Sequence, residues 1–154
     1  MKTIGMRVTV VVLHQGNILL IKERKRSGER YSLPGGKIEF LETIADAVRR
    51  EVREETGLFV EMERMLWVDE RIDHAGDGKH TIGIGVSARL AGEETTPVPG
   101  GMEDEQIAWA GWVTPEEWNT LPLESEQVRA RVNRVLSGAD TAQGYRDNLL
   151  DDRA

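Results

Sequence analysis

The sequence of 154 residues contains no cysteine. This absence excludes disulfide bonds, zinc sites with thiolate ligands and catalysis by a thiol. Long hydrophobic runs are also lacking. The longest, residues 8–13, is far shorter than the roughly 20 apolar residues that a membrane-spanning helix needs. No secretion signal precedes that run, so we expect a cytoplasmic protein that does not bind membranes.

Positive charge and histidine are scarce. Lysine and arginine total 20 against 27 aspartates and glutamates, which gives a formal net charge of −7 at pH 7. A surface for general nucleic-acid binding is normally basic, so we expect a small-molecule ligand and no nucleic acid. His14, His74 and His80 are scattered singly. Because none has a second nitrogen ligand at metal spacing, each is interpreted as structural or solvated.

Periodicity predicts the elements of one domain of common size. Two β-rich runs, residues 7–13 and 17–22, flank His14-Gln15-Gly16 and predict a hairpin. A helix is predicted after Thr43, and the order of all elements predicts an α+β fold with a mixed sheet between helices. The other predicted strands cover residues 31–36 (entering a glycine loop), 59–72, 80–90 and 107–113, and the other helices cover residues 115–119 and 124–136.

The domain organisation is simple. No internal repeat or domain boundary is visible, so we predict a single domain over residues 1–136. The tail, residues 137–154, is polar. Two interpretations of it stay open: a disordered segment, or an arm that packs on the domain.

Residues 36–58 are the most informative segment. Thr43, followed three residues later by Asp46, matches a capping box, and Gly57 supplies a C-terminal stop for a helix. At about 100° per residue, Glu51 and Glu55 project from the apolar side of this helix, with Glu54 at its border. The apolar face carries Ile44, Ala45, Ala47, Val48 and Val52, and the solvated face carries Asp46, Arg49 and Arg53.

This placement of glutamates favours a bound cation. Glutamates four residues apart repel each other, and near an apolar surface the cost rises unless a cation or a proton compensates. A hard divalent cation satisfies carboxylate oxygens, and Mg²⁺ shares its coordination shell with substrate phosphates. The alternative is a charged helix end in which Arg50 and Arg53 neutralise the glutamates. The helix alone leaves both interpretations open, whereas the spacing with Gly35, Gly36 and Glu42 favours the metal site.

The complete spacing resembles that of a Nudix hydrolase. It reads Gly36-x5-Glu42-x7-Arg50-Glu51-(apolar)-x-Glu54-Glu55-x-Gly57-(apolar), and the resemblance extends over about residues 5–136. Leu41 stands where glycine is frequent in the family, although the pattern leaves that position free. The resemblance implies an α/β/α sandwich with a mixed β-sheet between the helices.

The resemblance also implies roles for these residues. Glu51, Glu54 and Glu55 would hold Mg²⁺ or Mn²⁺, with help from the backbone carbonyl of Gly35 or Gly36. Arg50 would orient the carboxylates, and Glu42 would anchor the loop by pairing with Arg50 or nearby amides. The catalytic residues would thus be Glu51, Glu54 and Arg50.

The implied reaction is attack of water on phosphorus within a diphosphate linkage. The substrate would be a nucleoside diphosphate derivative, such as a nucleoside triphosphate or ADP-ribose. Across the family the general base lies either on the helix or on a later loop. Glu54 is the first candidate here, and Glu103 and Glu105 are loop alternatives, for which a solvated acidic loop is the simpler interpretation.

Substrate contacts are less constrained by the sequence. Arg24 and Arg26 are candidate phosphate clamps, and a merely solvated hairpin is the alternative. Tyr31 and Trp67 either stack on a base or pack in the core. Glu105 is a further candidate for substrate binding.

Two other classes of function were weighed. The first is a catalytically inactive Nudix-like nucleotide sensor or regulatory binding module, and the second is a purely structural interaction module. Intact acids at all positions of the pattern favour the enzyme over both. Because homodimers are common among similar proteins, a homodimer is a further expectation.

Overall fold

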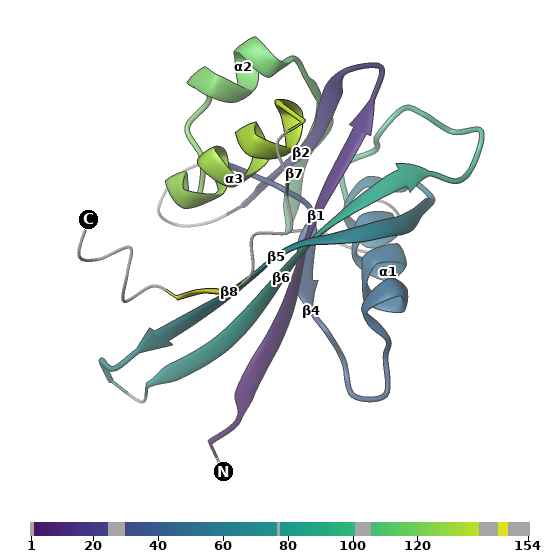
Figure 1. Cartoon of the computed structure of the whole chain (residues 1–154). Helices are drawn as coiled ribbons and strands as arrows, with labels where there is room; N and C mark the ends of the chain where they lie inside the picture. The colour runs from purple at the N-terminus through teal and green to yellow at the C-terminus, as the bar shows by residue number, and fades with distance from the viewer. Residues whose placement is uncertain (1, 25–29, 77, 101–105, 139–144, 148–154) are drawn as a thin grey trace.

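The computed structural model describes residues 2–24, 30–76, 78–100, 106–138 and 145–147. A mixed β-sheet forms the central layer, with α1 (Ile44–Thr56) on one side and α2 (Pro115–Thr120) and α3 (Glu126–Leu136) on the other (Figure 1). The prediction of an α+β fold with helices on both sides of a mixed sheet is therefore confirmed.

The strands of the sheet run in the order β3-β2-β1-β6-β5-β8, with β4 paired to β1 and β7 paired to β2. The pairs β1–β6 and β5–β8 are parallel and the other pairs are antiparallel. β1, β5 and β6 extend beyond the helices (Figure 1). The bounds are β1 Ile4–His14, β2 Asn17–Glu23, β3 Tyr31–Ser32, β4 Gly35–Lys37, β5 Val60–Asp73, β6 Lys79–Leu90, β7 Ile107–Val113 and β8 Tyr145–Asp147.

The predicted first hairpin is present and joins β1 to β2 through a two-residue turn. Gln15 and Gly16 both adopt left-handed backbone conformations, with φ of 51° and 79°. Positive φ at both central residues is the signature of the type I′ turn, whose twist matches that of the flanking strands. The turn therefore sets the register at the end of β1.

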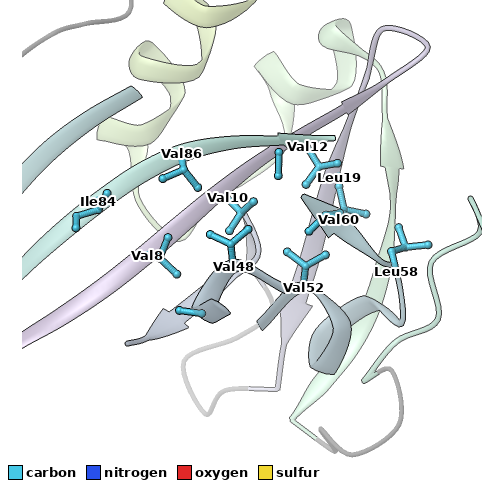
Figure 2. Packing of buried hydrophobic residues seen from close by; sticks show 12 residues of the cluster. Val8, Val10, Val12, Leu19, Val48, Val52, Leu58, Val60, Ile84 and Val86 are labelled. Carbon is cyan, nitrogen blue, oxygen red and sulfur yellow. The ribbon is translucent and has the colours of Figure 1, made fainter. Parts of the chain in front are cut away.

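Successive side chains of β1 point to opposite faces of the sheet and pack in two hydrophobic cores, one on each face. Val8, Val10 and Val12 pack with Val48 and Val52 of α1, as Figure 2 shows. On the opposite face, Val11 packs with Trp67, Trp118 of α2 and Val132 of α3. In the part of the chain that the structure describes, no helix is long and apolar enough to cross a membrane.

The structure corrects the prediction of one strand over residues 31–36 that enters a glycine loop. Gly35 and Gly36 are not in a loop, because with Lys37 they form β4, which pairs with β1. A Cβ on Gly35 would lie 2.1 Å from the carbonyl oxygen of Val8, so this pairing requires glycine. The predicted polar tail contributes β8, which the sequence did not predict.

Candidate active site

Helix α1 begins and ends where the sequence indicates, which fixes the direction of its glutamates. The Thr43 hydroxyl accepts a hydrogen bond from the Asp46 backbone N–H at 3.0 Å, and the Asp46 carboxylate accepts one from the Thr43 N–H at 3.3 Å. At the other end, Gly57 has φ 74° and donates its N–H to the carbonyl of Arg53. Between these caps, Glu51 and Glu55 lie one turn apart against Gly36 and Gly35 of β4, and Glu54 is adjacent to Glu55.

The three glutamates differ in burial. The Glu55 residue is only 3% exposed, and its Oε1 accepts a hydrogen bond from the Gly35 N–H at 2.8 Å. The Glu51 side chain is 12% exposed, and the Glu54 side chain is 40% exposed. A Cβ on Gly36 would lie 2.3 Å from Glu51 Oε1, so glycine at this position makes room for the carboxylate.

Arg50 connects these acids to the loop before the helix. Its Nε and Nη2 donate to the two carboxylate oxygens of Glu42 at 2.7 and 2.9 Å, a bidentate pair. Nη1 donates to Glu51 at 2.9 Å and to Glu54 at 3.4 Å. Nη2 also donates to the carbonyl of Lys37 at 2.8 Å. One guanidinium thus ties β4, the loop and the helix together.

The electrostatics of the cluster follow from these contacts. Burial raises the pKa of Glu51, and the lowering effect of Arg50 on that carboxyl is smaller. At Glu42 the hydrogen bond from Arg50 is the largest influence, and the pKa of that carboxyl is lowered. The pKa of Arg50 itself is raised, chiefly by its hydrogen bond to Glu42. Burial therefore disfavours the ionised form of Glu51, whereas Arg50 favours the ionised form of Glu42.

The chemistry of these side chains fits a hard divalent cation. Three carboxylates lie within about one helical turn, beside the backbone of β4. They form the oxygen donor set that Mg²⁺ prefers, without sulfur or nitrogen ligands. Among the described residues, however, no group of three acids or histidines already converges to hold a metal. Arg50 Nη1 contacts Glu51 and Glu54, so the guanidinium supplies part of the compensating charge.

A cavity of about 250 Å³ reaches this cluster at Gly35 of β4. It is bounded by the face of β1, β5 and β6 that carries Arg7, Asp69 and Gly83, by the segment before α3, and by Gly35. Gly35 belongs to both the cavity and the glutamate cluster, because it lines the cavity and donates its N–H to Glu55. The positive charge of Arg7 also acts on Glu51, whose pKa it lowers slightly.

The predicted substrate contacts have different locations. Tyr31 lines the cavity, edge-on to Trp109 at 5.3 Å between ring centroids. Trp67 is 3% exposed and packs in the core on the α3 face, so the core interpretation holds for it. The Arg24 N–H donates to the carbonyl of Gln106, and its side chain is not among those lining the cavity. Arg26, Glu103 and Glu105 lie outside the described residues.

The sequence analysis missed six charged residues of the cavity: Arg7, Glu23, Asp69, Arg71, Glu124 and Arg131. A signal for them was present in β6, where Gly83 and Gly85 alternate with apolar residues. Glycine inside a strand marks a place where another group approaches the backbone closely. Here the Asp69 carboxylate lies over Gly83 and the Trp67 ring over Gly85.

Comparison with known proteins agrees with the site. The NUDIX domain family matches residues 4–135. The chain belongs to the Nudix family. The predicted resemblance is thereby confirmed, and with it the origin of the glycine, glutamate and arginine spacing around α1.

Individual relatives add detail. The 8-oxo-dGDP phosphatase NUDT18 of Homo sapiens is 47% identical over 66 residues, which are 42% of this chain and 20% of that protein. The ADP-ribose pyrophosphatase of Methanocaldococcus jannaschii is 36% identical over 75 residues, which are 47% of this chain and 44% of that protein. The matches thus span less than half of either relative. These named enzymes support the prediction of a Nudix-type enzyme.

A solved structure shows the same fold. The NUDIX hydrolase from Nitrosomonas europaea superposes with a TM-score of 0.75 at 21% identity, covering 90% of this chain and 92% of that one. At this identity the likeness concerns the fold alone. It agrees with the mixed sheet between helices that Figure 1 shows.

Proposed function

We propose that the chain is a Mg²⁺- or Mn²⁺-dependent Nudix hydrolase that cleaves a diphosphate linkage in a nucleoside diphosphate derivative. The observation that carries this proposal is the double position of Gly35. It lines the cavity and binds the most buried glutamate of α1. A substrate in the cavity would therefore have its phosphates beside the carboxylates.

Residues of α1 and β4 are the proposed metal ligands. Glu51, Glu54 and Glu55 would hold the cation together with the backbone carbonyl of Gly35 or Gly36. Such a cation, when bound, polarises phosphoryl oxygens and lowers the pKa of bound water. Positioning and charge stabilisation supply most of the rate in phosphoryl transfer.

Arg50 and Glu42 are positioning residues in this proposal. Arg50 contacts Glu42, Glu51 and Glu54 at once, so it restricts the rotamers of two proposed ligands. Glu42 restricts Arg50 in turn through two hydrogen bonds. A site held in this way is organised before substrate arrives.

Glu54 is the proposed general base because its side chain is the most exposed of the three, at 40%. Its carboxylate would accept a proton from the water that attacks phosphorus. The bridging P–O bond then breaks, which releases a nucleoside monophosphate and a second phosphate product. Glu103 and Glu105 remain proposed alternatives for the base.

The substrate class rests on the cavity and on the relatives. Names such as 8-oxo-dGDP phosphatase and ADP-ribose pyrophosphatase support a small nucleoside diphosphate derivative. Tyr31 would contact the nucleoside, and Arg24, Arg26 and Glu105 remain proposed contacts. A homodimer and a cytoplasmic location also remain predictions, which light scattering and imaging of the tagged chain test.

A hydrolysis assay tests the proposal. Nucleoside triphosphates, 8-oxo-dGDP, ADP-ribose and nucleotide sugars are offered with Mg²⁺, with Mn²⁺ or with excess EDTA. We expect turnover of at least one substrate with metal and none with EDTA. Glu55→Gln should lower kcat by about a hundredfold or more, as for loss of one preorganised electrostatic group.

Glu63→Gln is the matched control, since Glu63 is exposed on β5 and should leave kcat unchanged. Full turnover in EDTA would contradict the metal requirement. Binding without turnover of any substrate would favour the inactive nucleotide sensor instead.

A further inference from the structure

Asp69 is held rigidly in the cavity by two donors that use the same oxygen. Its Oδ2 accepts hydrogen bonds from Trp67 Nε1 at 3.1 Å and from Arg131 Nη1 at 3.4 Å. Trp67 is buried in the core, and the Arg131 side chain is only 17% exposed. Neither donor moves easily, so the orientation of the carboxylate is fixed.

The other oxygen of Asp69 is available to a ligand. Within the described parts of the chain, Oδ1 accepts no hydrogen bond. It lies over Gly83, where a Cβ would be 2.6 Å away. Because a carboxylate oxygen accepts up to two hydrogen bonds, an oriented acceptor with spare capacity faces the cavity. Its side chain is 26% exposed, which leaves it accessible to a ligand.

The register of the sheet places this acceptor opposite a cation. Gly83 pairs with Arg7 on one side and with Asp69 on the other, so the three share one row across β1, β6 and β5. At a strand spacing of about 4.8 Å, Arg7 and Asp69 have their Cα atoms roughly 10 Å apart. Gly83 places no side chain between them, which makes room for the Asp69 carboxylate above it.

The two ends of the row differ in chemistry. Arg7 pairs with Lys37 of β4, next to Gly36, which lies against the Glu51 carboxylate, so anionic phosphate belongs at its end. Asp69 lies two strands away from Arg7, its charge is paired with that of Arg131, and its Oδ1 presents a hydrogen-bond acceptor at that end. A nucleoside diphosphate matches this polarity, since its phosphates and the hydrogen-bond donors of its base and ribose lie on opposite sides of the molecule.

We propose that Asp69 determines specificity, with its Oδ1 accepting a hydrogen bond from an N–H or O–H donor on the nucleoside half of the ligand, seated across Gly83. The donor is an amino group of the base or a hydroxyl of the ribose. The inference rests on the proposed function for the identity of the phosphate end. What it adds is that the ligand must donate a hydrogen bond to Asp69 Oδ1.

Substitution by asparagine should invert this requirement. Trp67 and Arg131 both donate to the position of Oδ2, so the amide oxygen of Asp69→Asn would stay there. The amide NH₂ would then replace Oδ1 and point into the cavity. The site would change from an acceptor to a donor with little change in volume.

The test measures binding of nucleotide pairs to the full chain in EDTA by calorimetry. One pair is ADP and the 5′-diphosphate of purine riboside, which lacks the 6-amino group. A second is GDP and IDP, which lacks the 2-amino group. Further arms compare ADP with its 2′-deoxy and 3′-deoxy forms. The arm that responds identifies whether the donor belongs to the base or to the ribose.

We expect wild type to lose about tenfold or more in affinity when the relevant donor is removed, as for hydrogen bonds to charged groups. Asp69→Asn should abolish or reverse that preference. Asp73→Asn is the matched control, since Asp73 ends the same strand, is exposed and does not line the cavity. It should keep the wild-type preference.

Gly83→Ala gives a second route if Asp69→Asn fails to fold. Its Cβ would displace the carboxylate, so the preference should be lost although Asp69 is retained. Equal discrimination in wild type and Asp69→Asn, or none in wild type for any pair, would overturn the inference. Discrimination in binding without hydrolysis in Mg²⁺ would support it and contradict only the proposed hydrolase.

Discussion

At the scale of single residues, Leu41 shows why one position of the family pattern favours glycine. The residue is the third of a turn closed by a hydrogen bond from the Glu42 N–H to the Glu39 carbonyl at 3.0 Å. Its φ is 66° and it is 89% exposed. A leucine in the left-handed region carries a backbone cost without compensating burial.

We therefore expect Leu41→Gly to raise stability by up to about 1 kcal/mol, because relief of the left-handed conformation outweighs the added freedom of the unfolded chain. Leu41→Val should lower stability, since β-branched residues fit positive φ poorly. Urea denaturation measures both. Phe40→Gly, at an adjacent exposed position, is the control and should be destabilising. A loss of stability in Leu41→Gly would contradict this account.

At Glu51, the proposed function as a metal ligand opposes the stability of the metal-free fold. Burial is the largest influence on its pKa and raises it, despite the opposing effect of Arg50, so ionising Glu51 costs more free energy in the folded chain than in the unfolded chain. Glutamine keeps an oxygen for Arg50 Nη1 and removes the charge. In EDTA at pH 7.5, Glu51→Gln should raise Tm by a few degrees at most, for about 1 kcal/mol.

Differential scanning fluorimetry measures this shift. Glu61→Gln, at an exposed carboxylate that pairs with Arg49, is the matched control and should not raise Tm. A lower Tm for Glu51→Gln would show that the contact with Arg50 outweighs the cost of burial.

At the scale of elements, helix α1 depends on its N-terminal cap to aim the glutamates. Thr43→Ala removes the acceptor for the Asp46 N–H, which typically costs about 1 kcal/mol and corresponds to a fall in Tm of roughly 2–4 °C. Thr114→Ala removes the same capping box from α2. Because α2 is one-and-a-half turns long and carries no proposed ligand, only Thr43→Ala should also lower kcat.

Local signals explain which elements the sequence predicts well. The Thr43 cap, the apolar spacing and Gly57 are all within α1, and the hairpin turn at Gln15-Gly16 is equally local. β4 was mistaken for a loop because its strand character depends on pairing with Val8, 28 positions earlier by number. Likewise β8 pairs with β5, a strand far away in the sequence.

The same distinction applies to the candidate site. The direction of Glu51 and Glu55 follows from helical geometry and agrees with their burial. The Asp69–Gly83–Arg7 row depends on the register of three strands, which no local pattern fixes. Charged residues inside strands were therefore overlooked in favour of the basic hairpin, part of which lies outside the described residues.

At the scale of the whole molecule, a bound cation should stabilise the fold. A ligand that binds only the folded state at a hundredfold excess over its Kd contributes about 2.7 kcal/mol. We expect millimolar Mg²⁺ to raise the Tm of wild type and to raise that of Glu55→Gln less. Mg²⁺-free buffer with matched ionic strength from NaCl is the control. An equal response of both proteins would place the cation elsewhere.

The pairing of β8 with β5 has a consequence for solubility. Without it, β5 would be the edge of the sheet, with a row of backbone N–H and C=O groups open to strands of other molecules. β8 covers that edge at Val68, Asp69 and Glu70. A chain cut after residue 138 should therefore self-associate on storage, visible as turbidity and as a rise in thioflavin T fluorescence, whereas the full chain should not. The tail would thus act as a guard against intermolecular β-pairing.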